Sequence, residues 1–91
     1  MVTALVLMNC TRDRINETAQ LLVDMSGVSE VYSISGRYDL AAVIRVKSPE
    51  DLADVVTNKM PKITSIEKTE TMIAFRTYSQ DDLEQVFTVG E

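Results

Sequence analysis

The sequence predicts an α+β fold whose elements follow the order β-α-β-β-α-β. Three observations support this prediction. Apolar residues fill or alternate along strand-length segments, and between these segments they recur at helical spacing. Short connections with turn or helix-start residues separate the segments. The chain has 91 residues, which suffices for one domain but not for two. We therefore expect a single domain over residues 1–91, with its core in residues 1–78.

The first strand and the first helix are predicted within residues 2–27. Residues 2–9 are nearly all apolar, which is typical of a strand buried on both faces. Asp13 is placed to cap the following helix, and Gly27 is placed to end it. The apolar stripe of this helix repeats every three or four residues and consists of Ile15, Ala19, Leu22 and Met25.

A β-hairpin is predicted next. Residues 28–35 alternate in polarity, which predicts a strand with Val28, Tyr32 and Ile34 on one face. The turn consists of Gly36, Arg37, Tyr38 and Asp39. Residues 40–47 predict the third strand, and one of its faces carries Leu40, Ala42, Ile44 and Val46.

The second helix has the strongest start signal in the sequence. Ser48 is placed to cap it, Pro49 suits its first position, and acidic residues follow in the first turn. Its apolar stripe is Leu52, Val55, Val56 and Met60, and Pro61 is expected to end it. Residues 66–78 predict the last strand. A short C-terminal helix is predicted from residue 79, with Leu83, Val86 and Phe87 on its apolar side.

Two βαβ halves in tandem predict a ferredoxin-like sandwich. Right-handed crossovers place both helices on one face of a four-stranded antiparallel sheet. The opposite face should then be polar, yet the first strand carries apolar residues on both of its faces. An apolar face of this kind marks an interface, so we expect a homodimer packed sheet to sheet, of the dimeric α/β-barrel type. The alternative cover is the C-terminal helix, which is too short for four strands.

The composition excludes several classes of function. The chain has no histidine, so neither a catalytic triad nor a histidine-ligated metal is expected, and we expect no enzyme activity and no cofactor. Cys10 is the single cysteine and is expected to fill the core. The net charge is −5 and the basic residues are scattered, which argues against direct nucleic-acid binding. No leader and no membrane-length apolar run is visible, so a cytoplasmic protein is expected.

The chemistry of binding is concentrated in the predicted hairpin turn. Gly36 supplies a positive φ or room for a ligand to approach the backbone. The Asp39 carboxylate suits an ammonium group, and the amides of the turn suit a carboxylate, which are the two needs of a free α-amino acid. The plain alternative is a turn with solubilising residues. Thr69 and Thr71 share a strand face, but threonines are ordinary strand formers. Spacing alone therefore favours a solubilising turn and an ordinary strand over a binding site.

Four segments match one known pattern, namely residues 4–7, 28–40, 51–53 and 69–73. The most specific part is a valine-rich strand that leads into Gly-x-Tyr-Asp, followed later by Thr-x-Thr and two apolar residues. Over about residues 1–78 the chain resembles the effector-binding domain, or RAM domain, of the leucine-responsive regulatory protein/AsnC (Lrp/AsnC) family of transcription regulators.

The resemblance implies a dimer built on the sheets, and in this family four dimers often close into an octameric ring. It implies an amino-acid effector bound at contacts between dimers, close to the hairpin turn. Carried over residue by residue, the ligand-binding residues are Gly36, Arg37, Tyr38 and Asp39, with Thr69, Thr71 and Met72 of the last strand, from the same or a neighbouring subunit.

Full-length members of the family also carry an N-terminal helix-turn-helix domain. This chain begins directly at the first strand, so a stand-alone version is expected that does not bind DNA itself. Such a domain would modulate transcription through its effector, or by joining a full-length Lrp/AsnC regulator.

Three alternatives stay open at this point. The first is a purely structural oligomeriser with an empty site. The second is an ACT-type module, which has the same strand order, but its ligand usually lies near a glycine after the first strand, and residues 9–12 contain none. The third is a small dimeric α+β-barrel enzyme, such as a cofactor-independent monooxygenase, although such enzymes often use histidine.

Overall fold

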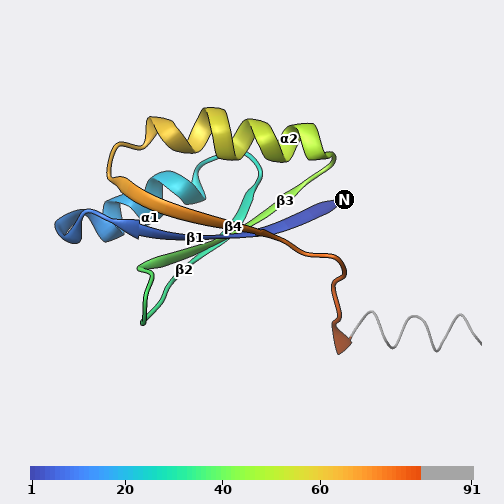
Figure 1. Ribbon diagram of the computed structural model, residues 1–91, viewed down its shortest axis with the longest axis horizontal. Helices are drawn as coiled ribbons and strands as arrows, with labels where there is room; N and C mark the ends of the chain where they lie inside the picture. Colours follow the sequence, from blue (N-terminus) through green and yellow to red (C-terminus); the bar gives the residue numbers. More distant parts are fainter. Residues whose placement is uncertain (81–91) are drawn as a thin grey trace, which may run out of the picture.

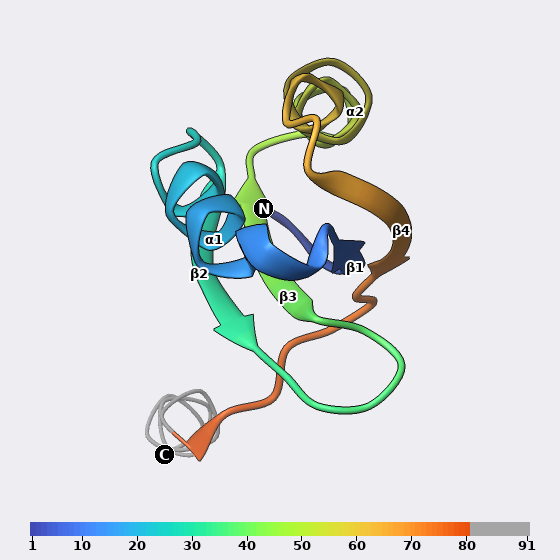
Figure 2. The same cartoon turned by 90° about the vertical axis from the view of Figure 1, so that its left-hand side faces the viewer.

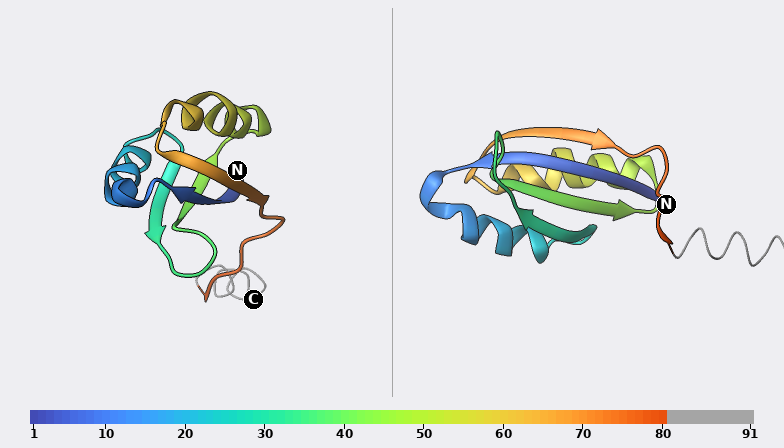
Figure 3. Two further views of the ribbon diagram at one scale, coloured as in Figure 1. Left: turned by 60° about the vertical axis from the view of Figure 1, so that its left-hand side comes forward. Right: turned by 90° about the horizontal axis from the view of Figure 1, so that it is seen from below.

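Four strands form one antiparallel sheet in the order β2-β3-β1-β4, and two helices cover one of its faces (Figures 1, 2 and 3). The strands are β1 (Val2–Cys10), β2 (Val28–Ser33), β3 (Leu40–Val46) and β4 (Ile66–Ile73), and the helices are α1 (Ile15–Val23) and α2 (Pro49–Asp54). The ferredoxin-like α+β prediction is thus confirmed. This computed structural model describes residues 1–80, so the predicted C-terminal helix lies outside the described residues.

The core lies between the helices and the two inner strands. In the register of β1 and β3, Ala4 pairs with Ile44 and Val6 pairs with Ala42, and all four side chains are fully buried. Paired residues of an antiparallel ladder point to the same face, so the ladder concentrates apolar side chains under the helices. Cys10 also belongs to this core, as expected.

The start of α1 differs from the prediction. Asp13 does not cap the helix, because residues Arg12–Arg14 form a separate 3₁₀ turn (η1) and the cap position falls on Arg14, without a side-chain bond. The Thr18 hydroxyl instead donates to the Arg14 carbonyl at 2.7 Å and lies 2.5 Å from the Ser65 hydroxyl. The predicted apolar stripe packs into or against the core, but only Ile15, Ala19 and Leu22 lie on the helix. Helix α1 ends at Val23, so it stops before Met25 and before Gly27, where its end was predicted.

Helix α2 begins as predicted but continues differently. The Ser48 hydroxyl accepts a hydrogen bond from the Asp51 amide at 3.1 Å, which confirms the cap. After Asp54 the helix widens into a π-helical turn, η2 (Val55–Lys59), and then tightens into a 3₁₀ turn, η3 (Met60–Lys62). Two features interrupt the regular hydrogen-bond ladder of the helix. Pro61 has no N–H to donate. The Thr57 hydroxyl donates to the Ala53 carbonyl at 2.6 Å.

The predicted faces of β2 are wrong at one point. The pairing of β2 with β3 shifts between Val28 and Glu30, which leaves Ser29 as a bulge. Val28 therefore shares the helix-facing side with Val31, whereas Tyr32 points to the opposite side of the sheet. A one-residue shift exchanges the faces of every later side chain, and alternation in the sequence does not reveal it.

The last strand is shorter than predicted. Strand β4 ends at Ile73 rather than at Tyr78. The Ala74 amide still donates to the Thr3 carbonyl at 2.9 Å, but β1 begins at Val2 and offers no partner further along. Beyond this point the chain leaves the sheet (Figure 1). The Phe75 side chain is fully exposed.

The face of the sheet away from α1 and α2, called the outer face below, has an apolar centre with polar and charged residues around it. The apolar side chains are Leu5, Leu7, Tyr32, Ala41, Val43 and Met72, and the surrounding residues include Glu30, Arg45, Lys68 and Glu70. Leu5 is 40% exposed and Met72 is 41% exposed. Strand β1 is therefore fully buried only on its helix-facing side within one chain, and the predicted apolar outer face is confirmed at its centre. The homodimer that would cover it stays a prediction.

Two glycines with positive φ provide a test of the fold. Gly27 has φ +97° and Gly36 has φ +112°, but only at Gly27 would an added Cβ meet side chains, those of Val46 and Val55 at 3.1 Å. We expect Gly36→Ala to lower the free energy of unfolding by about 1–2 kcal/mol, because of the backbone conformation alone. Gly27→Ala should lower it further, because the side chains of the core must also shift. Urea unfolding of both variants measures this, and equal losses would contradict the packing described for Gly27.

Candidate functional site

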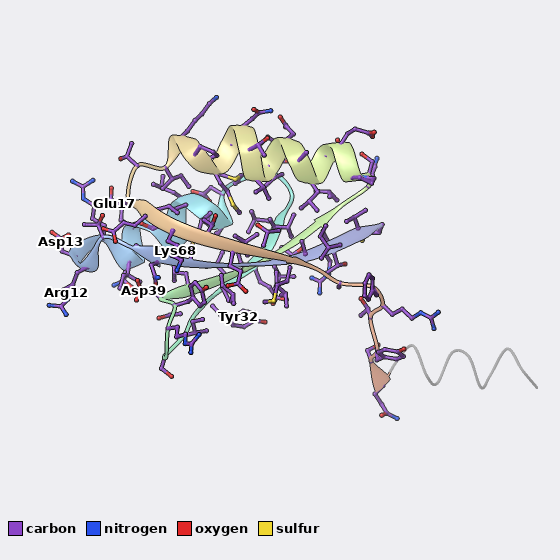
Figure 4. All side chains as sticks on the ribbon, in the orientation of Figure 1. Arg12, Asp13, Glu17, Tyr32, Asp39 and Lys68 are labelled. Atoms are coloured by element: carbon purple, nitrogen blue, oxygen red, sulfur yellow. The ribbon has the colours of Figure 1, made fainter. Side chains whose placement is uncertain are left out.

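The hairpin loop between β2 and β3, residues 34–39, folds against the end of β1. The Asp39 amide donates to the Met8 carbonyl at 2.9 Å, and the Asp39 carbonyl accepts from the Ile34 amide at 3.0 Å. The ladder of β1 with β3 ends at Met8 and Leu40, so the Cys10 amide has no strand partner on that side. The Asp39 carboxylate accepts from this amide at 2.9 Å through Oδ2. Figure 4 labels Asp39 at this end of the sheet. Asp39 therefore holds the loop in place.

Tyr38 connects the loop to the far edge of the sheet. Its hydroxyl donates to Glu70 Oε1 on β4 at 2.5 Å. This hydrogen bond is the main cause that raises the pKa of Tyr38 above its ordinary value. Glu70 pairs with Leu7 and so lies on the outer face. Glu70 was not among the predicted site residues, although it is the central residue of the Thr-x-Thr motif.

The tip of the loop is open. Gly36 has a positive φ, and a Cβ built there would meet nothing within 4 Å. Arg37 beside it is exposed. The glycine is thus required by the backbone conformation, and its surroundings leave the amides of the turn approachable from outside the chain.

The predicted residues of the last strand lie on two different faces. Thr69 pairs with Met8 and Thr71 pairs with Val6, so both threonines lie on the helix-facing side of β4. Met72 pairs with Leu5 and lies on the outer face, the same face as Glu70. The structure therefore brings Tyr38 and Glu70 together but turns the two threonines away from them.

Thr69 borders a groove on the helix-facing side. This groove has a volume of about 440 Å³ and lies between β4 and the end of the second helical segment. Its lining includes Val56, Met60, Pro61 and Ile63 as well as Lys68. The groove is apolar on the helix side and polar along the strand, and it does not contain the hairpin loop.

Cys10 takes no part in this chemistry. The thiol is buried, and burial together with the nearby Asp39 charge raises its pKa. A thiol held in its neutral form is a weak nucleophile, so Cys10 is a packing residue. Within residues 1–80 no group of three or more His, Cys, Asp or Glu side chains is arranged to hold a metal ion. None of the helices in this part of the chain has the length and apolar character of a membrane span.

Comparison with known proteins identifies relatives of this chain. The model of the Lrp/AsnC ligand binding domain matches residues 3–83. The uncharacterized HTH-type transcriptional regulator YugG of Bacillus subtilis is 33% identical over 93 residues, which cover 99% of this chain and 55% of YugG. The chain spans about half the length of the curated relatives it matches.

Solved structures share the fold. The protein TTHA0845 from Thermus thermophilus superposes with a TM-score of 0.81 at 40% identity, over 88% of this chain and 100% of that one. AsnC of E. coli superposes with a TM-score of 0.80 at 22% identity, over 87% of this chain and 54% of that one, which concerns the fold alone.

The role of Asp39 in holding the loop is testable by two substitutions. Asp39→Ala removes the acceptor and leaves the Cys10 amide without a partner, so we expect a loss of about 1–3 kcal/mol of unfolding free energy. Asp39→Asn keeps an oxygen for that amide and should recover most of the loss. Chemical denaturation distinguishes the two, and equal losses in both variants would show that charge rather than the hydrogen bond is decisive.

Proposed function

Because the chain belongs to the Lrp/AsnC ligand-binding domain family, we propose that it is an amino-acid effector-binding and oligomerisation domain that modulates transcription. The family is one of transcription regulators and not of enzymes, which sets aside the alternative of a small barrel enzyme. The match to the Lrp/AsnC family also sets aside the ACT-type alternative. The observation that carries the proposal is the open hairpin loop, held between the end of β1 and Glu70.

The loop offers the groups that a free amino acid needs. A zwitterion presents an ammonium and a carboxylate from one carbon, and a site that shields it from water must meet both charges. In this proposal the amides around Gly36 and the Arg37 side chain meet the carboxylate, while the Tyr38 ring closes over the ligand. Asp39 contributes by fixing the loop. Thr69, Thr71 and Met72 complete the site from the last strand of a neighbouring copy.

The apolar outer face supports the oligomeric part of the proposal. A second copy packed on it, sheet to sheet, would cover Leu5, Leu7 and Met72 and form a homodimer. An octameric ring of four such dimers would then bring the hairpin loops of neighbouring dimers together. We further propose that the assembly acts in the cytoplasm, together with a full-length regulator of the same family.

The net charge of −5 supports a role without direct DNA contact by these residues, since a DNA-binding surface needs clustered basic groups.

A purely structural oligomeriser is the second candidate. One observation favours it, namely that Asp39 and Tyr38 both have partners within the chain, so the polar residues of the loop are also explained without a ligand. The two candidates agree on the dimer and differ on the ligand.

A thermal-shift panel of the twenty amino acids separates them. A ligand that binds only the folded state raises stability by mass action, by about 2.7 kcal/mol at a hundred times its Kd. That corresponds to a rise of roughly 10 °C or more in Tm for a domain of this size. We expect at least one amino acid at 10 mM to raise Tm, and a flat panel would leave the structural oligomeriser as the function.

The dimer is tested by a charge on the outer face. Leu5→Glu places a carboxylate in the centre of the proposed contact, and burying it there without a partner is costly. We expect light scattering to give at least twice 10.2 kDa for the parent and about 10.2 kDa for the variant. Leu21→Glu is a matched control, because Leu21 is 48% exposed on α1, away from the outer face. A monomeric parent at micromolar concentration would refute the sheet-to-sheet dimer.

A further inference from the structure

Two carboxylates lie at the hairpin loop, and their surroundings differ. Asp39 is partly buried, and its Oδ2 already accepts the Cys10 amide at 2.9 Å. Its backbone amide and carbonyl are also bonded, to Met8 and Ile34. Asp39 is thus fixed on three sides by its own chain, and moving its carboxylate toward a ligand would release the amide that it satisfies.

Glu70 is held at the loop but keeps binding capacity. Its Oε1 accepts the Tyr38 hydroxyl, and the structure gives Oε2 no hydrogen-bond partner within residues 1–80. An ionised carboxylate accepts about four hydrogen bonds, so most of this capacity is unused. Neither of the two ion pairs found in this part of the chain, Arg45 with Glu30 and Lys59 with Asp54, involves Glu70.

The bond to Tyr38 orients Glu70 without neutralising it. A tyrosine hydroxyl is a neutral donor, so the negative charge stays available to a cation. An ammonium group has three N–H donors and no acceptor, and its hydrogen bonds to a carboxylate are the strong, charge-assisted kind. The exposed Arg37 and the loop amides lie on the same hairpin, and they are positive groups and N–H donors, in contrast to the negative carboxylate of Glu70.

We propose that Glu70 binds the ammonium group of the amino-acid effector, and that Asp39 is a positioning residue that fixes the loop. This inference rests on the function proposed above and names the residue that recognises the amine. Tyr38 sets the place of the Glu70 carboxylate relative to the loop. The site then selects α-amino acids over acids that lack the amine, because only the ammonium meets the charge of Glu70.

The selectivity gives a direct experiment by calorimetry. The two probes are the amino acid with the largest thermal shift in the panel and the α-hydroxy acid with the same side chain, in which a hydroxyl replaces the ammonium. The parent should bind the amino acid about ten- to a hundredfold more tightly, the range for one charged hydrogen bond. Glu70→Gln should reduce that preference to about threefold or less, with little change for the hydroxy acid.

Two further variants serve as controls. Glu67→Gln makes the same change of charge on the same strand, and we expect it to keep the full preference; its carboxylate lies 3.5 Å from the Thr11 hydroxyl, away from the loop. Asp39→Asn, which retains an oxygen for the Cys10 amide, should also keep the preference for the amine. Circular dichroism and light scattering establish that each variant is folded and assembled like the parent.

The outcomes are distinct. A full preference in Glu70→Gln overturns the proposal, and its loss in Asp39→Asn alone would assign the ammonium to Asp39 instead; in both cases the amino-acid-binding function stands. A parent that binds no amino acid overturns the proposed function and this inference together.

Discussion

The apolar character of both faces of β1 is the constraint on which the rest of the structure depends. Ala4, Val6 and Met8 are fully buried beneath the helices, and each larger aliphatic side chain so buried contributes about 1.5–3 kcal/mol. Leu5 and Leu7 alternate with them on the outer face, where no helix of residues 1–80 covers them. An antiparallel sheet with one solvated face normally carries polar residues there. Here the hydrophobic effect acts on both faces, and the sheet of a second copy, in the proposed homodimer, would cover the outer one.

The candidate site follows from where the ladders of β1 end. Strand β1 continues to Cys10, but β3 begins opposite Met8, so one amide projects beyond the ladder. Asp39 satisfies that amide, and in doing so it folds the hairpin loop against the sheet instead of letting it extend. This placement carries Tyr38 within reach of Glu70 on the opposite edge. A mismatch in strand length thereby brings together the loop and the carboxylate of the proposed binding site.

Much of the fold was predictable, because periodicity and capping are local signals. The Ser48 cap, the buried stripe of α1 and the apolar outer face were all predicted from spacing. The end of β4 was not, because it is set by the start of β1, far away in the sequence. The bulge at Ser29 was missed for a similar reason: the alternation of the sequence continues through it, and only the partner strand reveals the shift. Asp13 was misplaced as a cap because it lies within a 3₁₀ turn that precedes the helix.

The site was predictable in part. The hairpin residues were proposed from their chemistry together with the family resemblance, and their binding role stays a prediction. Glu70 was not proposed, since a glutamate in an exposed strand gives no signal until Tyr38 is seen to reach it.

The opposite orientation of the threonines has a consequence for assembly. Within one chain, Tyr38 and Glu70 lie on a different side of β4 from Thr69 and Thr71. A ligand at the hairpin of one copy can therefore meet the threonines only of another copy. In the proposed site, binding and oligomerisation are then coupled. A ligand that contacts two copies favours the assembly that brings them together, and by linkage the assembly raises the affinity for the ligand to the same degree.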